Sequence, residues 1–449
     1  MDPTFSAYAS RSVPRYTSYP TAPHFSGSVG PRDYTRWLAG LPPSEPVSLY
    51  LHVPFCRQIC WYCGCNMKLA SRDATIEAYA GSLMQEVRLA ARALPSRMTL
   101  SHLHWGGGTP TALSPDTLMR AMELIDDVFD IVPGAELAIE SDPRTLSVDM
   151  INRIGCLGFT RASFGVQEFD LRVQQAINRI QPPQMVRAAV DGLRDAGVAG
   201  INFDLIYGLP HQTVDTLLNT VRLCAGMRPD RIALFGYAHV PWMAKRQRMI
   251  DETTLPDARA RVDQAQAASD AILDAGYVAI GLDHFALPGD PLALAADRGT
   301  LRRNFQGYTT DSASTLLGLG ATSIGRTSEG YVQNITETGA WARAVQDGIL
   351  PVGKGFALTQ DDRMRAAVIE RLMCQGQVNL ADVADMHGVS RNWYEMVDDQ
   401  LWKMASDGLI LRSGPDIRVQ EKARPLVRVV ASVFDAYLRS GPARHSVAV

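Results

Sequence analysis

The chain reads PFCRQICWYCGC between residues 54 and 65, and this segment holds four of its seven cysteines. Cys56, Cys60 and Cys63 follow the spacing C-x3-C-x2-C, and Cys65 comes two positions later. The preceding residues 47–53, VSLYLHV, are mostly apolar and rich in β-branched and aromatic side chains, which is typical of a buried strand. The cysteines are therefore predicted to lie on a loop that leaves a strand, where three thiolates can converge on one metal centre.

Several kinds of site use closely spaced cysteines. A structural zinc site needs a second pair of cysteines or histidines at a distance, and no such pair follows. An odd number of cysteines and the absence of a secretory leader argue against disulfides. Cys60 and Cys63 alone could form a thioredoxin-like redox pair, but the additional cysteine argues against it. Three thiolates without a fourth protein ligand favour an iron–sulfur cluster with one open iron. This spacing, with the aromatic Tyr62 before the last ligand, resembles the signature of the radical S-adenosylmethionine (SAM) enzymes.

The length of 449 residues allows one large domain and a smaller one. We expect an N-terminal arm over residues 1–46, irregular because prolines interrupt it, then a central domain over 47–355 and a helical C-terminal domain over 356–449. A net charge of −3 gives no excess of basic residues that would favour binding of nucleic acid. No apolar run is long enough to span a bilayer. The expected compartment is the cytoplasm.

Strand-like and helix-like segments alternate six times between residues 47 and 239. One of the amphipathic helices begins at Ser114, with Pro115 in its first turn, and another ends at Gly197. Apolar strands that alternate with helices favour a parallel sheet covered by helices. Six units are too few for a closed eightfold barrel, so we predict an α/β fold with an open, partial (β/α)6 barrel. The predicted strands are residues 47–55, 98–105, 136–140, 161–166, 200–206 and 231–237.

Polar residues recur at the predicted carboxyl ends of these strands, where such a sheet places its chemistry. The second strand ends in GGGTPT (residues 106–111), whose backbone can approach a ligand closely and offer it N–H groups. A glycine triplet or a single acidic residue is weak evidence for a binding site. Polar groups at the ends of successive strands, next to the cysteine loop, together predict a SAM pocket. The other groups are residues 140–144, Gln167, Asp204 and His239, with Arg179 in the connection after the fourth strand.

Further motifs extend this pattern over nearly the whole chain. They are RYTSYP (15–20), YLHVPFC (50–56), CGCN (63–66), HWGGGTPT (104–111), DLIYGLP (204–210), DHF (283–285) and NFQGYTT (304–310). From Arg15 to about Leu438 the chain thereby resembles the oxygen-independent coproporphyrinogen III oxidases, radical SAM enzymes of haem synthesis in bacteria. Related haem chaperones typically lack the fourth cysteine and the YTSYP segment, and both are present here.

The resemblance implies the residues of the cluster site and of catalysis. It implies a 4Fe-4S cluster, and it implies Cys65, Tyr62 and Glu140 as catalytic residues. Cys65 would act as a thiol behind the ligands or on the path of the radical. The implied cluster ligands are Cys56, Cys60 and Cys63.

The resemblance also implies a SAM site, with a second SAM beside the first. The residue types suit the cofactor, because Glu140 can pair with its ammonium group, Arg179 with its carboxylate and Asp204 with its ribose hydroxyls. The implied SAM contacts are Tyr50, Tyr62, Gly107, Gly108, Thr109, Glu140, Gln167, Arg179, Asp204, Ala238 and Ile324.

The reaction implied by the resemblance acts on two propionates of coproporphyrinogen III. A radical derived from SAM removes a hydrogen from the β-carbon of a propionate, and loss of CO2 and one electron leaves a vinyl group; the second round gives protoporphyrinogen IX. The propionates need cationic partners, for which Arg15 and Arg303 are candidates. We expect an electron donor, an electron acceptor, a monomer, and no nucleic-acid or membrane partner.

Other functions stay open on the sequence alone. They are a haem-binding chaperone, a radical SAM enzyme for another tetrapyrrole and, more remotely, a transcription factor. The last arises because residues 379–411 have the pattern of a helix-turn-helix with a following hairpin, as in winged helices. Acidic residues at 382, 385, 398 and 399 interrupt any basic face there, which favours a structural role as a lid or buttress over the active site.

Overall fold

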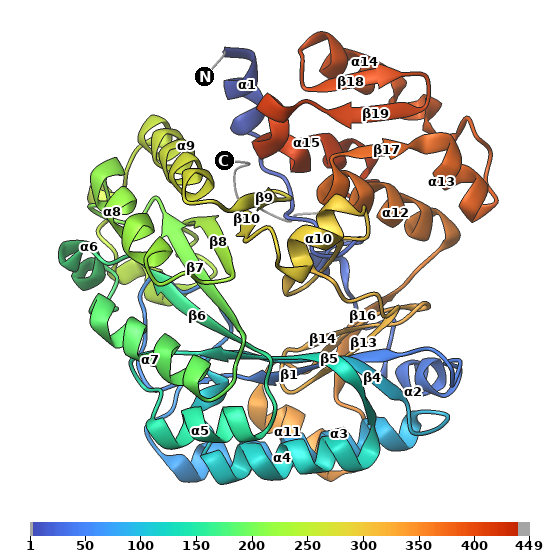
Figure 1. The fold of residues 1–449 in the computed structure, drawn as a ribbon. Coiled ribbons are helices and arrows are strands. Elements are labelled where there is room, and N and C mark those ends of the chain that lie inside the picture. The colour runs from blue at the N-terminus through green and yellow to red at the C-terminus, as the bar shows by residue number, and fades with distance from the viewer. Residues whose placement is uncertain (1–2, 439–449) are drawn as a thin grey trace. The chain divides into compact units, whose positions relative to one another are not determined.

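The computed structural model describes residues 3–438 (Figure 1). The chain forms two compact units, which we call the sheet unit and the terminal unit. The sheet unit comprises residues 26–275 and 311–357, and the terminal unit comprises residues up to 25, residues 276–310 and residues from 358 onward. This division departs from the expected domains at two places, because residues 26–46 fold with the sheet unit and residues 276–310 with the terminal unit. Within the described residues, no helix is both long and apolar enough to cross a bilayer.

Six parallel strands form the centre of the sheet unit, and they confirm the six predicted strands. β1 is buried on both faces, because the neighbouring residues Ser48 and Leu49, which point to opposite faces, are each 1% exposed. The strands are β1 (Val47–Val53), β4 (Thr99–Gly107), β5 (Asp130–Ser141), β6 (Arg161–Gln167), β7 (Gly200–Tyr207) and β8 (Arg231–Gly236), and they pair in that order.

Four further strands extend this sheet beyond β1. β13 (Thr315–Leu319) pairs with β1 in parallel, and antiparallel pairing then adds β14 (Ile324–Arg326), β15 (Gly330–Asn334) and β16 (Val352–Ala357). No pairing between β16 and β8 closes the sheet in the described chain. The prediction of an open α/β sheet rather than a closed barrel is therefore confirmed.

Amphipathic helices cover the sheet, and α3, α4, α5 and α11 lie along one side of it in Figure 1. The start of α4 is as predicted: Ser114 Oγ accepts from the Thr117 N–H, and Pro115 is the first helical residue. The helices of this unit are α2 (Pro31–Ala39), α3 (Asp73–Ala93), α4 (Pro115–Val128), α5 (Val148–Cys156), α6 (Leu171–Ala176), α7 (Pro183–Asp195), α8 (Val214–Ala225), α9 (Ala258–Asp274) and α11 (Thr338–Gln346).

A buried carboxylate joins α3 to the far part of the sheet. Glu86 accepts hydrogen bonds from the Gly320 N–H at 2.8 Å, Asn334 Nδ2 at 2.6 Å and Trp341 Nε1 at 2.9 Å. Burial raises the pKa of Glu86 to about 7, although these three donors act in the opposite direction. This single side chain thus connects the first helix after the cysteine loop to β15 and α11.

The expectation of an irregular N-terminal arm is wrong. Residues 3–39 include two helices, α1 (Pro3–Ala9) and α2, and each has a proline as its first residue. Proline is compatible with the first turn, because the N–H that it lacks has no partner within a helix. In α2 the Asp33 carboxylate also accepts from the Gly30 N–H at 3.1 Å, which caps the helix start.

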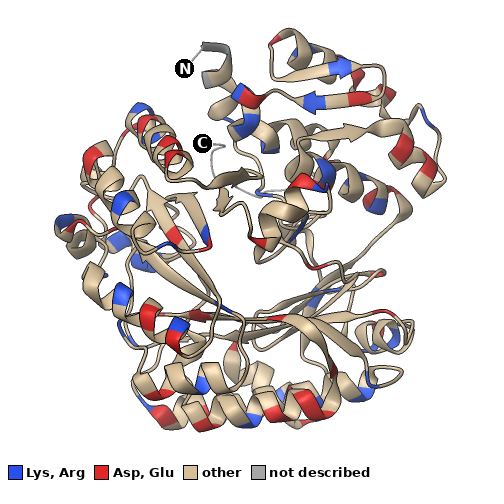
Figure 2. Cartoon of the chain, in the orientation of Figure 1, with Lys and Arg blue, Asp and Glu red and all other residues tan. Residues whose placement is uncertain are grey.

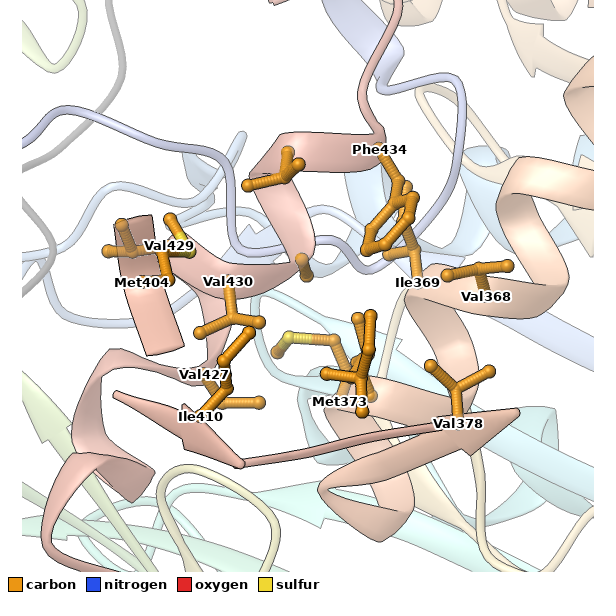
Figure 3. Close-up of a cluster of buried hydrophobic side chains, with 14 of the residues drawn as sticks. Val368, Ile369, Met373, Val378, Met404, Ile410, Val427, Val429, Val430 and Phe434 are labelled. Atoms are coloured by element: carbon orange, nitrogen blue, oxygen red, sulfur yellow. The ribbon is translucent and has the colours of Figure 1, made fainter. Parts of the chain in front are cut away.

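The terminal unit is mostly helical and has its own core (Figure 3). Val368, Ile369 and Phe434 belong to this core, and so do Tyr16 and Tyr19 of the N-terminal segment. As expected, two helical segments are followed by a hairpin, although the second consists of a 3-10 turn (Trp393–Val397) and α14. The elements here are α12 (Gln360–Gln375), α13 (Leu380–His387), α14 (Asp398–Ser406), α15 (Val427–Ala431) and the strands β17 (Gln377–Asn379), β18 (Ile410–Ser413) and β19 (Asp416–Val419).

Charges of both signs occur on these elements (Figure 2). Arg412 of β18 forms an ion pair with Asp398, and Arg391 forms one with Asp385. Residues 276–310 add β9 (Val278–Ile280), β10 (His284–Ala286), α10 (Pro291–Asp297), β11 (Arg302–Asn304) and β12 (Gly307–Thr309).

Candidate functional site

The cysteine loop leaves the carboxyl end of β1, as predicted. Two short parallel strands close its base, β2 (Phe55–Cys56) and β3 (Lys68–Leu69). Cys56 and Cys60 are buried, Cys63 is partly buried and Cys65 is exposed, and all four are free thiols. Cys65 therefore differs from the three predicted ligands in being exposed to solvent.

Each of the three predicted ligand sulfurs accepts a hydrogen bond. Arg144 Nη2 and Arg179 Nη1 both donate to Cys60 Sγ at 3.3 Å. Thr109 Oγ1 donates to Cys56 Sγ at 3.4 Å, and the Cys65 N–H donates to Cys63 Sγ at 3.4 Å. Two guanidinium groups and two neutral donors thus stabilise negative charge on sulfur, which is what thiolate ligands of a cluster require.

The thiol chemistry also fits a bound cluster. Burial raises the pKa of Cys56 to about 11, so its thiolate requires a bound cation at neutral pH. In the described residues, no group of three or more His, Cys, Asp or Glu side chains is arranged to hold a metal ion. A four-iron cluster spaces its ligands more widely than a single ion does, because each sulfur binds a different iron.

A buried ion-pair cluster supports the two arginines. Asp142 contacts Arg144 at 2.6 Å and Arg179 at 3.5 Å, and all three side chains are less than 10% exposed. Burial opposes ionisation of Asp142, but the two arginines outweigh it and lower its pKa. Each nitrogen of Arg179 donates to a protein acceptor, since its Nε and Nη2 donate to the Gly165 carbonyl. Arg179 therefore binds the cysteine loop through Cys60 in this structure. Its pairing with the SAM carboxylate stays a prediction.

The glycine segment brings β4 close to its neighbours. A Cβ on Gly106 would lie 2.8 Å from Glu140 Oε1 and 2.8 Å from the Tyr50 ring, and one on Gly108 would lie 2.8 Å from the Phe55 carbonyl oxygen. The Gly107 N–H donates to Glu140 Oε2 at 3.0 Å, and the Gly108 N–H donates to the Val53 carbonyl at 2.8 Å. These glycines permit close packing, but contrary to expectation these two N–H groups already have protein acceptors.

Glu140 is positioned to meet a cation. Its Oε1 lies 3.1 Å from His104 Nε2, and its side chain remains 39% exposed. Tyr50 stacks on His104 with a ring separation of 5.8 Å, and its hydroxyl lies 3.0 Å from His52 Nδ1. The two predicted SAM contacts Tyr50 and Glu140 are thus brought together. His104 also belongs to this group, although the sequence analysis named it only as part of the motif HWGGGTPT.

Three further predicted SAM contacts, Gln167, Asp204 and Ile324, lie on strands of the same sheet. Gln167 ends β6 with a φ of +66°, and its Oε1 is buried without a hydrogen-bond partner in the described structure. Asp204 lies within β7, which continues to Tyr207, rather than at its end. Ile324 lies near Tyr50, because Gly318 pairs with Tyr50 and a Cβ on Gly318 would fall 2.4 Å from the Ile324 carbonyl oxygen. The unsatisfied Gln167 oxygen is suited to accept from a ligand donor.

Two residues after β8 were missed by sequence reasoning. Gln247, 1% exposed, donates to the Tyr62 carbonyl at 2.7 Å and to the Ala238 carbonyl at 3.1 Å. Arg246 Nη2 donates to the Cys65 carbonyl at 3.2 Å. These contacts tie the segment after β8 to the cysteine loop, and no motif in the sequence marks them.

Comparisons with known proteins identify relatives of this chain. The profile of the radical SAM superfamily matches residues 50–224. The oxygen-independent coproporphyrinogen III oxidase of Bradyrhizobium diazoefficiens is 50% identical over 99% of this chain and 98% of its own. The protein of that name from Paracoccus denitrificans is 42% identical over 95% and 94%. The solved coproporphyrinogen III oxidase of Escherichia coli, described as a radical SAM enzyme, is 36% identical with a TM-score of 0.91 and covers 95% of this chain and 100% of its own.

Proposed function

Because the chain belongs to the oxygen-independent coproporphyrinogen III oxidases of the radical SAM superfamily, we propose that it converts two propionates of coproporphyrinogen III to vinyl groups. The product is protoporphyrinogen IX, in anaerobic haem synthesis. Each round removes a hydrogen atom, one electron and CO2 from a propionate. The observation that carries the proposal is the loop after β1, where the sulfurs of Cys56, Cys60 and Cys63 each accept a hydrogen bond.

These three cysteines would hold the 4Fe-4S cluster, with SAM beside it. When bound, these cofactors supply one-electron cleavage of a sulfonium bond and removal of hydrogen from an unreactive carbon. Arg144, Arg179 and Thr109 hold the sulfur atoms and balance their charge. Burial of Cys56 and Cys60 at the base of the loop limits the access of water.

The exposed face of Glu140 orients SAM by its ammonium group. His104 and the Gly107 N–H fix the carboxylate, so little rotamer freedom is lost when the cation binds. The buried oxygen of Gln167 offers a second acceptor at the next strand end. The other SAM contacts that we propose are Tyr50, Tyr62, Gly107, Gly108, Thr109, Arg179, Asp204, Ala238 and Ile324.

Further parts of the proposal rest on the family. We place Cys65 and Tyr62 among the catalytic residues with Glu140, and we propose a second SAM molecule. The enzyme would work as a cytoplasmic monomer, with a one-electron donor for the cluster and a one-electron acceptor for the substrate. Free thiols throughout the described cysteines are compatible with a reducing compartment. Residues 356–449 would form the helical C-terminal domain.

Anaerobic reconstitution tests this function. The protein is loaded with iron and sulfide and mixed with SAM, a reductant and coproporphyrinogen III, and the products are identified by mass spectrometry. Two successive losses of CO2 are expected, and Cys60→Ser should give none. A protein that binds haem and releases no CO2 would be a chaperone instead. A product of another mass would indicate a different tetrapyrrole reaction.

A further inference from the structure

One buried glutamine bonds to two separate parts of the proposed SAM site. Gln247 lies in a 3-10 turn (Lys245–Met249) that follows β8. Its Nε2 donates to the Tyr62 carbonyl at 2.7 Å and to the Ala238 carbonyl at 3.1 Å. Its Oε1 accepts from the Val240 N–H at 2.6 Å. Both protons of the amide nitrogen and the amide oxygen are therefore used, and they fix the orientation of this side chain.

Packing alone does not require a polar side chain at this position. Ala244, Gln247 and Ile250 are buried at every third residue, which is the spacing of one face of a 3-10 turn. The other two residues of this face are apolar. Burial of an amide costs free energy unless its polar atoms are paired. The glutamine is therefore explained by the bonds that it makes rather than by the volume that it fills.

The two carbonyl groups belong to irregular segments from distant parts of the sequence. Neither Tyr62 nor Ala238 lies in a helix or a strand. Tyr62 lies between the predicted cluster ligands Cys60 and Cys63, and it is 185 residues away from Gln247 in the sequence. Ala238 follows the end of β8. Gln247 thus connects the backbone between two cluster ligands to the end of a strand of the proposed SAM site.

The turn that carries Gln247 has further attachments. Arg246 Nη2 donates to the Cys65 carbonyl at 3.2 Å and to the Met67 carbonyl at 3.4 Å. Ile250, directly after the turn, is buried in an apolar cluster against which the Tyr62 side chain packs. The turn should therefore stay in place when the Gln247 amide is removed. A change in SAM binding would then report the lost hydrogen bonds rather than a detached segment.

We propose that Gln247 is a positioning residue for SAM, which fixes the separation between Tyr62 on the cysteine loop and Ala238 after β8. This inference rests on the proposed function, because both residues are proposed SAM contacts. A ligand that contacts both segments binds more tightly when their separation is set before it arrives. Since the chain itself uses every polar atom of the amide, Gln247 acts through these two residues and not on the cofactor directly.

Equilibrium binding of SAM tests the inference without turnover. Gln247→Met has a side chain of similar length and removes all three hydrogen bonds. The reconstituted enzyme is titrated with SAM by anaerobic calorimetry, without a reductant, so that SAM stays intact. The dissociation constant should rise by about tenfold, as expected for the loss of about one net hydrogen bond. The iron content should equal that of the wild type, because no predicted ligand is changed.

Gln264 of α9 provides a matched control. Gln264 and Gln247 are each 1% exposed. Gln264 Nε2 donates to the Gln212 carbonyl at 2.8 Å, and its Oε1 accepts from the Gly208 N–H at 2.9 Å. None of these partners is a proposed SAM contact. Gln264→Met should therefore lower the melting temperature as Gln247→Met does, but bind SAM with the affinity of the wild type.

A shorter amide gives a second variant. Gln247→Asn keeps the amide but lacks one methylene group, so it cannot reach both carbonyls, and a smaller loss of SAM affinity is expected. A wild-type dissociation constant in Gln247→Met or, where that variant does not fold, in Gln247→Asn would overturn the inference. An equal loss of SAM affinity in Gln264→Met would also overturn it, because the effect would then be one of general stability.

The proposed function is judged separately, by CO2 release from coproporphyrinogen III. If the enzyme releases CO2 and Gln247→Met binds SAM normally, the positioning role is lost and the reaction is kept. If SAM affinity depends on Gln247 but no CO2 is released, the positioning role is kept and the proposed reaction is lost. A reconstituted wild type that binds no SAM would overturn both.

Discussion

Arg144 Nη2 lies 3.3 Å from Cys60 Sγ, and the same guanidinium forms a buried ion pair with Asp142. The cysteine loop is thereby linked to the end of β5, the strand that also carries Glu140. A residue proposed to stabilise the cluster ligand Cys60 and a residue proposed to orient SAM are thus both positioned by β5 and the residues directly after it.

The arginine beside Cys60 should affect the reduction potential. A cation stabilises the extra electron of a reduced cluster, so Arg144→Gln should make the potential more negative. The expected shift is on the order of 50 mV, which corresponds to about 1 kcal/mol for one electron. Redox titration monitored by electron paramagnetic resonance would measure it. Arg153→Gln, which removes an outer ion pair with Asp116, is the control, and equal shifts in both variants would contradict the prediction.

The three predicted ligands should be essential for the cluster, unlike Cys65. Serine at position 56, 60 or 63 removes a thiolate, so each variant should lose most of its iron after reconstitution. Cys65→Ser should retain iron, because Cys65 lies outside the C-x3-C-x2-C spacing of the predicted ligands, but it should lose turnover if Cys65 acts in catalysis. Iron and sulfide analysis with the absorption spectrum measures the difference. Full iron content in Cys60→Ser would refute the ligand assignment.

The close approach at Gly106 should matter for SAM binding. Gly106→Ala adds a carbon 2.8 Å from Glu140 Oε1 and 2.8 Å from the Tyr50 ring, so the side chains of these two proposed SAM contacts must move. We expect SAM affinity to fall by about tenfold or more, the effect of a misplaced charged partner. Gly81→Ala in α3, whose Cβ would have nothing within 4 Å, should bind SAM normally. Equal SAM dissociation constants for the two variants would count against this role of Glu140.

Glu86 should make stability depend on pH. Its pKa is about 7 in the folded chain, against 4.5 for the unperturbed group. Between these values the folded state keeps a proton that the unfolded state has lost, so stability falls as the pH rises through the window. The loss is about 3 kcal/mol at most, at about 1.4 kcal/mol per pKa unit.

Glu86→Gln should remove this dependence. The unfolding free energy of the wild type minus that of the variant is then larger at pH 5 than at pH 8. Glu123→Gln, at an exposed position of α4, should show no such change. Denaturation at both pH values measures the differences, and parallel curves for wild type and Glu86→Gln would contradict the prediction.

The alternation of apolar strands and amphipathic helices predicted all six parallel strands, because burial on both faces favours mostly apolar runs such as 47–53. Cysteine spacing likewise predicted the loop. Arg246 and Gln247 were missed because their roles depend on distances between segments that are far apart in the sequence, which no local pattern encodes. The glycine segment was predicted to offer N–H groups to a ligand, but those of Gly107 and Gly108 donate to Glu140 and Val53, which no local pattern could reveal. The two N-terminal helices were missed because proline was interpreted as a breaker.

The terminal unit joins two segments that lie far apart in the sequence. The Tyr16 hydroxyl donates to Asp435 Oδ2 at 3.0 Å, across 419 residues of sequence. A ribosome releases the amino end first, so Tyr16 must wait for its partner Asp435 until a further 419 residues have been synthesised. A nascent chain that stalls or is cleaved before that point would expose this aromatic side chain to chaperones and proteases.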